Sequence, residues 1–175
     1  ICGNPTQILS DAMRFCVDGE KFTNVDRRTE IFDDEANISF VNDSKNFTMR
    51  VGVNVCCDGF IGYKVRLTGK SDIDMNDIFL SLPIKRESLK YFIGLGKKGG
   101  LFDGKIDWKW NENYNQDGFW AGDTNGGIKI KLKGENYLKP FVNIYYNHRK
   151  LKVPESWGNS GNGGIRFIND VFVAY

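Results

Sequence analysis

The sequence contains very little of what most catalytic and metal sites are built from. It has one histidine, His148, and four cysteines, Cys2, Cys16, Cys56 and Cys57, among 175 residues. A single histidine excludes Ser-His-Asp, Cys-His and multi-histidine metal sites within this chain. The cysteines are too few for a disulfide scaffold and form no Cys-x-x-Cys pair, so we expect buried or free thiols, no metal and no cofactor.

Long apolar runs and an excess of one charge are also missing. No stretch approaches the roughly 18 consecutive apolar residues that cross a bilayer. The 24 basic and 22 acidic side chains leave a formal charge of +2, and no basic run is long enough to bind a phosphate backbone. We therefore expect neither a membrane nor a nucleic acid as a partner.

What the chain does contain suits a folded interior. Hydrophobic residues make up 41% and aromatic residues 14%, with 20 glycines and only 4 prolines. This length and composition predict one domain with one core over residues 1–175. The chain starts and finishes on apolar residues, Ile1 and Tyr175, which we interpret as the ends of a piece of a longer protein with further sequence on the C-terminal side.

Strict alternation of apolar and polar residues dominates the sequence. In residues 47–55 and 61–67 every second side chain is apolar, which predicts two strands that each have one apolar face. The pair Asp58-Gly59 between them tolerates the positive φ of a tight turn, so we expect an antiparallel hairpin. Shorter alternating runs lie at residues 13–17, 22–25, 29–32, 38–41, 78–82, 128–132, 141–145 and 165–167.

These short runs predict the fold class. No window shows a sustained helical stripe, and only residues 85–91 could form a turn or so of helix. Many short strands bounded by Gly, Asn, Asp or Pro predict an all-β fold, a two-sheet antiparallel β-sandwich or a large supersandwich with long Gly/Trp-rich loops.

Residues 94–127 are the most unusual part of the sequence, because glycines, tryptophans and aspartates alternate there. We expect a long loop of the kind that carries function on a β scaffold. Its tryptophans could stack on sugar rings, or they could pack under the loop or against a neighbouring domain, which is the commoner role of such side chains. The candidate residues for carbohydrate binding or interdomain contact are Trp108, Trp110, Trp120, Asp103, Asp117, Asp123, Asn125 and Trp157.

Three local patterns have simpler explanations than the chemistry they suggest. Residues 94–99 spell Gly-x-Gly-x-x-Gly, but no helix can start after them to receive a pyrophosphate, so we predict a tight loop. The acidic pair Asp34-Glu35 lies between two alternating runs and is typical of a hairpin tip rather than of a glycosidase acid and base. Asp117 and Asp123 match no calcium-loop spacing, which favours turn capping.

Several blocks of residues resemble one known family. The sequence is similar to the N-terminal domain of glycoside hydrolase family 123, strongly over residues 58–164 and only in strand pattern before them. The blocks that carry this resemblance are Gly94–Gly100, Asp107–Trp110, Asn115–Asp117, Trp120–Gly127, Lys133–Tyr137, Pro140, Asn143–Tyr146, Pro154–Trp157 and Gly161–Gly164.

The resemblance implies a β-sandwich that precedes a (β/α)8 catalytic barrel in enzymes that release β-linked N-acetylgalactosamine. Those enzymes are of the retaining, substrate-assisted type, in which an Asp orients the 2-acetamido group and a neighbouring Glu protonates the leaving oxygen. That Asp-Glu pair belongs to the barrel, so we expect no catalytic residue in this chain and no activity from it alone.

The function predicted is therefore that of a non-catalytic domain of a glycoside hydrolase. It would pack on the barrel of the same polypeptide, with residues 94–127 buttressing the barrel or bordering the glycan site. Two alternatives stay open: an autonomous carbohydrate-binding module, and a structural or adhesion domain with no enzyme attached. The expected location is outside a bacterial cell, secreted or at the cell surface.

Overall fold

The computed structural model describes residues 7–110, 118–134 and 163–175. These residues form antiparallel strands and one short 3₁₀ helix, η1 (Arg86–Ser88), and no α-helix is found among them. The all-β prediction is confirmed, and η1 lies where a single helical turn was expected. In this part of the chain no helix has the length and apolar character needed to cross a membrane.

The chain divides into two compact units. Unit 1 comprises residues 1–15 and 79–175, and unit 2 comprises residues 16–78. The chain passes from one unit to the other within β1 (Arg14–Val17) and again at the start of β6 (Ile78–Pro83). The single domain over residues 1–175 stays a prediction.

Unit 1 carries a two-sheet sandwich. One sheet has the order β1-β6-β13-β12-β9, and the other has the order β11-β10-β7-β8. The strands not yet given are β7 (Tyr91–Gly94), β8 (Lys97–Leu101), β9 (Asp107–Lys109), β10 (Gly118–Gly122), β11 (Gly127–Lys131), β12 (Gly164–Ile168) and β13 (Val171–Ala174).

The core of unit 1 joins its two sheets. Leu82, Ile165 and Phe172 from the first sheet and Phe92 and Phe119 from the second belong to one cluster of buried side chains. Alternation explains this arrangement, because every second residue of these strands points to the same side and those sides are apolar. The predicted two-sheet packing is thus present in unit 1.

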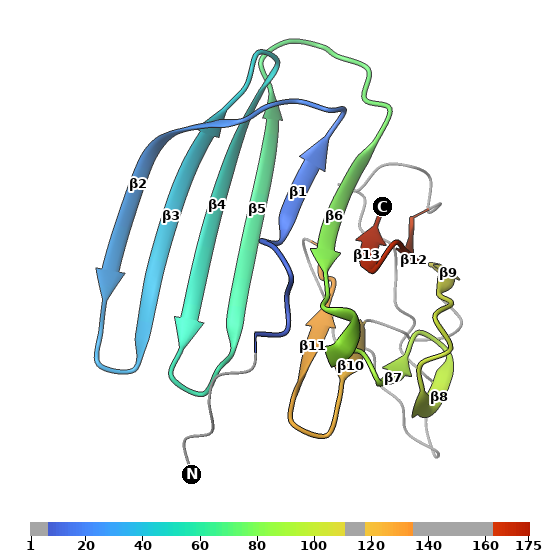
Figure 1. Ribbon diagram of the computed structural model, residues 1–175. Coiled ribbons are helices and arrows are strands. Elements are labelled where there is room, and N and C mark those ends of the chain that lie inside the picture. The colour runs from blue at the N-terminus through green and yellow to red at the C-terminus, as the bar shows by residue number, and fades with distance from the viewer. Residues whose placement is uncertain (1–6, 111–117, 135–162) are drawn as a thin grey trace, which may run out of the picture. The chain divides into compact units, whose positions relative to one another are not determined.

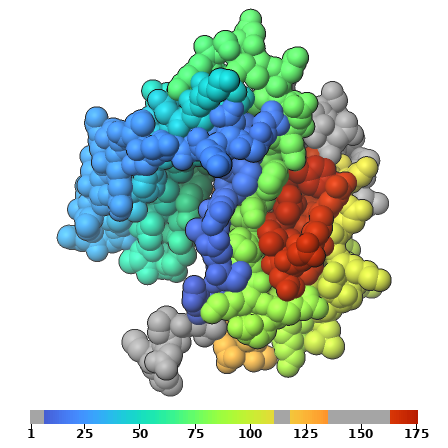
Figure 2. Space-filling view, turned by 45° about the horizontal axis from the view of Figure 1, so that its top comes forward, coloured from blue at the N-terminus to red at the C-terminus, as the bar shows by residue number. Residues whose placement is uncertain are grey.

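The prediction of two sheets in all is incomplete, because the structure has a third. Unit 2 contains a four-stranded antiparallel sheet of order β2-β3-β4-β5, formed by β2 (Thr23–Ile31), β3 (Glu35–Asp43), β4 (Phe47–Cys56) and β5 (Ile61–Gly69). Short turns connect these long strands, so each strand pairs with the next one in the sequence. The four strands lie side by side in Figure 1 and make a continuous blue-to-teal surface in Figure 2.

The predicted hairpin of residues 47–67 is confirmed. Strands β4 and β5 pair in antiparallel register, with Val51 opposite Val65. Gly59 has a φ of 87°, and the Asp58 side chain accepts a hydrogen bond from the Phe60 N–H at 2.9 Å. The side chains of the apolar face are not all buried: Phe47 is 3% exposed, whereas Tyr63 is 52% exposed.

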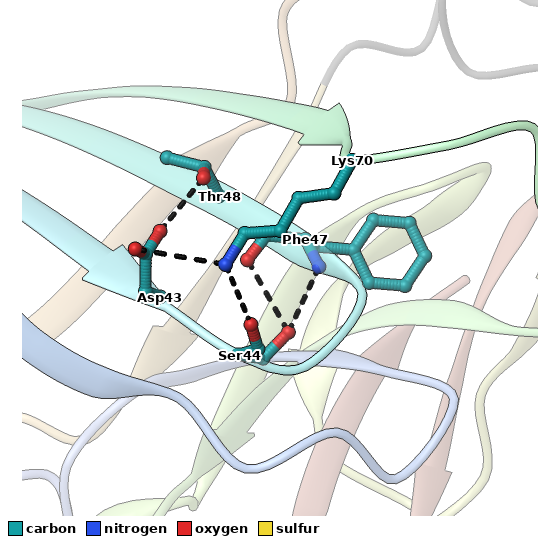
Figure 3. A network of polar contacts seen from close by, with 5 residues as sticks. All are labelled: Asp43, Ser44, Phe47, Thr48 and Lys70. Atoms are coloured by element: carbon teal, nitrogen blue, oxygen red, sulfur yellow. Dashed lines mark hydrogen bonds and ion pairs between the residues drawn. The ribbon is translucent and has the colours of Figure 1, made fainter.

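A polar network fixes the opposite end of this sheet (Figure 3). The Asp43 carboxylate accepts a hydrogen bond from the Thr48 hydroxyl at 2.7 Å and lies 3.6 Å from the Lys70 ammonium. Lys70 also donates to the Ser44 carbonyl at 2.8 Å, and the Phe47 N–H donates to the Ser44 hydroxyl at 3.0 Å. The hydrogen bond from Thr48 is the main reason why the pKa of Asp43 lies below its ordinary value. The β3–β4 turn and the end of β5 are thereby joined.

The prediction of one long loop over residues 94–127 is wrong for the parts that the structure describes. Strands β8, β9, β10 and the start of β11 lie in this range. Glycine-rich segments such as residues 97–101 can still pair as strands, because ladder hydrogen bonds come from the backbone and need no side chain. The tight loop predicted at residues 94–99 is confirmed as the β7–β8 turn, where Gly94, Leu95 and Gly96 have φ values of 118°, 50° and 79°.

Candidate functional site

Trp108 faces the interior of unit 1. It lies on β9 opposite Ile165 of β12 and packs partly buried against the core cluster. Its indole N–H is buried and finds no hydrogen-bond partner among the described residues. The Trp110 ring meets the Trp108 ring edge to face, with centroids 5.6 Å apart, and the backbone N–H of Trp110 donates to the Gly163 carbonyl at 2.9 Å. The main role of Trp108 is therefore to pack against the core of unit 1.

Trp120 faces the other way. Its neighbours on β10, Phe119 and Ala121, are 3% and 0% exposed and point into the core, so Trp120 projects from the outer face of the sheet. In register it lies opposite Lys129 of β11 and Ile93 of β7. These residues line a shallow hollow of about 410 Å³. The structure thus separates Trp108 from Trp120, and the three tryptophans do not form one flat platform.

Two glycines set the position of the Trp120 ring. An ideal Cβ on Gly122 would lie 2.8 Å from the Trp120 ring carbon Cζ2, and one on Gly127 would overlap the same indole. Both positions belong to the strands that flank the β10–β11 turn. The two glycines let the indole of Trp120 lie close against the backbone of the sheet, which fixes the orientation of the ring.

Asp103 forms an ion pair instead of standing free for a ligand. Its carboxylate accepts hydrogen bonds from the Lys97 ammonium at 2.7 and 2.8 Å and from the Lys105 N–H at 3.0 Å. The hydrogen bond from Lys97, followed by the one from Lys105, holds the pKa of Asp103 below its ordinary value. Asp103 therefore fixes the segment that follows β8.

We expect Lys97→Met to raise the pKa of Asp103 toward that of a free carboxyl group. Because this pKa is lower in the folded state, the stability that the pair gives is present above the unfolded pKa of about 3.9 and is lost as the pH falls through the folded value. Lys97→Met should remove this pH-dependent contribution to the free energy of unfolding. NMR titration of the Asp103 carboxyl carbon measures the shift, and Lys98→Met, on the same strand, is the control that should leave it in place.

Asp123 and Asn125 build the β10–β11 turn. The Asp123 carboxylate accepts hydrogen bonds from the N–H groups of Asn125 and Gly126 at 2.7 and 3.1 Å. The first of these is the main reason why the pKa of Asp123 is lowered. This is the geometry of a turn cap. Asp117 and Trp157 lie outside the described residues, as does the predicted strand at residues 141–145.

Asp34-Glu35 lies at a hairpin tip, as predicted. The Phe32 N–H donates to the Glu35 carbonyl at 2.8 Å across the β2–β3 turn. The Glu35 side chain accepts hydrogen bonds from the amides of Asn37 and Asn54 at 3.1 and 2.9 Å. Within residues 7–110, 118–134 and 163–175, no three His, Cys, Asp or Glu side chains come together as metal ligands.

A second concave surface, on unit 2, was missed by sequence reasoning. It lies on the polar face of β3, β4 and β5, has a volume of about 630 Å³, and includes Asn37, Gly52, Asn54 and Phe60 in its lining. The available signal was glycine in the interior of two strands among polar residues, since interior strand glycines mark sites where a ligand or another backbone comes close.

The fold defines the class of the protein as an all-β domain. Over residues 1–171 the chain matches a family model described as "Glycoside hydrolase 123, third domain". The chain therefore belongs to the glycoside hydrolase 123 family. Neither the curated proteins nor the solved structures contain a match to it.

The match corrects the predicted position of the domain. The resemblance placed the chain at the N-terminus of these enzymes, whereas the family model is that of their third domain. Blocks of matching residues identify a family, but they carry no information on the order of domains along the polypeptide. A third domain accompanies other domains of the same chain.

Proposed function

We propose that this domain supports the catalytic barrel of an enzyme that cleaves β-linked N-acetylgalactosamine glycans, and that it contacts the barrel through Trp120. Belonging to the third-domain family supports an accessory role. The outward position of Trp120 supports the contact, because its aromatic side chain and the 51%-exposed Ile93 make an apolar patch. Lys129 and Lys131 of β11 line the same hollow. We also propose a location outside a bacterial cell, where such glycans occur.

Trp120→Ala in the full enzyme tests this proposal. Truncation of a buried interface tryptophan costs about 2 kcal/mol or more, so the variant should lower the melting temperature of the enzyme and its turnover. The isolated 175-residue chain should lose less stability than the full enzyme, because Trp120 lies outside the core cluster. Calorimetry of both forms separates loss of interdomain contact from loss of the fold.

Leu101→Ala supplies a matched control, since this residue is 74% exposed on the edge strand of the same sheet. Leu101→Ala should leave the turnover of the enzyme and the melting temperatures of the enzyme and of the isolated chain unchanged. If the Trp120→Ala enzyme had the melting temperature and the turnover of the unmodified enzyme, the proposed contact would be wrong.

The second candidate function is an autonomous carbohydrate-binding module, favoured by the half-buried indole of Trp120 opposite Lys129. Titration of the chain with an oligosaccharide that contains N-acetylgalactosamine should then change tryptophan fluorescence. An unchanged spectrum at millimolar sugar removes this candidate for unit 1, where all four tryptophans of the sequence lie.

A further inference from the structure

The second concave surface has the shape of an open groove with a glycine floor. Gly52 on β4 would place a Cβ in open space, with no atom within 4 Å. It lies directly opposite Ser39 on one side and Lys64 on the other, so a row of small or flexible side chains crosses the sheet. Since nothing packs over Gly52, its glycine is not required by the fold of unit 2, and the hollow it leaves faces outward.

Beside the floor lies a ladder of hydrogen-bonded amides. Asn37 and Asn54 face each other across β3 and β4, and the Asn54 amide donates to the Asn37 side-chain oxygen at 2.9 Å. Both amides also donate to the Glu35 carboxylate. This network orients polar groups at the surface before any ligand arrives, which reduces the entropy lost on binding. Free lone pairs on Glu35 and one N–H of Asn37 remain for hydroxyl groups, which both donate and accept.

An aromatic ring borders the groove at the same end. Phe60 is 55% exposed, and its ring lies over the backbone of Gly62, where a Cβ would come within 3.3 Å of the ring carbon Cε1. Glycine at position 62 therefore lets the ring lie close to the strand. An exposed aromatic face beside fixed amides suits a sugar ring, which has an apolar C–H face and a polar rim of hydroxyls.

Arg28, Glu30 and Lys64 are the charged residues that line the groove, and beyond Lys64 the same face of the sheet carries two more cations. Arg50 and Arg66 are directly opposite each other on β4 and β5, and Lys64 lies two residues before Arg66 on the same face. Among the described residues, none of these three forms an ion pair. Like charges directly opposite each other destabilise a sheet. Arg50 is near enough to the Asp43 carboxylate to help lower its pKa, but that carboxylate bonds to Thr48 and Lys70. A cluster of three cations that form no ion pair with the described residues is complementary to an anionic ligand.

We propose that this groove binds an acidic oligosaccharide, with one sugar ring against Phe60 and an acidic group held by Lys64, Arg66 and Arg50. Arg66 lies four residues after Gly62 on β5, a span of roughly 14 Å at about 3.4 Å per residue, so the ligand extends over more than one sugar unit. This proposal goes beyond the proposed function, because it concerns unit 2 and does not involve Trp120.

Calorimetric titration of the 175-residue chain tests it with three hexasaccharides. Chondroitin sulfate carries sulfates and carboxylates, hyaluronan carries carboxylates alone, and chitohexaose is neutral. We expect at least one acidic hexasaccharide to bind at least tenfold more tightly than chitohexaose. The difference in affinity between the two acidic sugars then tells whether sulfate or carboxylate is the group recognised.

Tryptophan fluorescence separates this binding from binding at Trp120. Because residues 16–78 contain no tryptophan, binding in the groove should leave the fluorescence unchanged.

Three variants assign the binding to the groove. Arg66→Gln should weaken it at least fivefold through lost charge, and Phe60→Ala at least threefold through lost stacking. Gly52→Leu should abolish it by filling the floor with no change of charge, and the open space above Gly52 lets the fold accept the leucine. Lys45→Gln, which removes an exposed cation at the β3–β4 turn, and Leu101→Ala are the matched controls and should bind like the original chain.

Three results would overturn the proposal. The first is no binding of either acidic sugar at millimolar concentration. The second is tighter binding of chitohexaose. The third is binding of acidic sugars that Gly52→Leu and Phe60→Ala leave intact and that 0.5 M salt abolishes, a pattern that indicates general attraction of polyanions to the surface and no groove.

Discussion

Replacing Phe172 by alanine should destabilise unit 1 by about 3–5 kcal/mol. Phe172 is 0% exposed, and its ring centroid lies 4.7 Å from that of Phe167, 4.8 Å from that of Phe119 and 5.9 Å from that of Phe92. These neighbours come from both sheets of the sandwich, so truncation leaves a cavity that neither sheet can fill alone. Denaturant unfolding followed by near-ultraviolet circular dichroism measures the loss.

Phe172→Leu provides the comparison. Leucine retains most of the buried volume, so this variant should cost clearly less than the alanine variant. If both substitutions left the unfolding midpoint of unit 1 where it is, the assignment of Phe172 to the centre of the core would be wrong.

Gly94→Ala should destabilise unit 1 by about 2–4 kcal/mol, because backbone strain and a steric clash act at the same position. Gly94 has a φ of 118°, which residues with a Cβ rarely adopt. A Cβ there would also lie 2.6 Å from the carbonyl oxygen of Gly118 and 2.8 Å from the Cα of Phe119, both backbone atoms that cannot turn aside. The same unfolding measurement applies.

Gly100→Ala is the matched control, since Gly100 lies on the partner strand β8 and a Cβ there meets no atom within 4 Å. Its effect should stay within about 0.5 kcal/mol. A cost at Gly100 as large as that at Gly94 would show that loss of glycine itself, and not the geometry of Gly94, is responsible.

Much of the fold could be predicted from alternation. Residues 47–67 gave a correct hairpin because Asp58-Gly59 interrupts two clear periods of two. The edge strand β2 was predicted as two separate runs, and in the structure Thr23–Ile31 is one strand whose residues are all exposed. An edge strand without a buried face needs no apolar alternation. The alternation was therefore too weak to predict β2 as one strand.

The candidate site could be predicted only in part. The sequence indicates that Trp108 and Trp110 share a strand face, and their rings are in contact. It does not indicate which face of a strand points inward when both faces are apolar, and Trp120 stands between Phe119 and Ala121 in such a strand. The groove of unit 2 depends on register across β3, β4 and β5, which joins residues that no local spacing relates.

Strand β2 also has a consequence for the behaviour of the protein in solution. It ends the sheet of unit 2 on one side, where unpaired backbone groups could recruit a strand from another molecule. Its pairing with β3 is irregular between Asn24 and Asp26, and it carries Arg27, Arg28 and Glu30. A kinked, charged border of this kind discourages intermolecular strand addition. On the β2 side, the sheet of unit 2 is therefore protected against the addition of strands from other molecules.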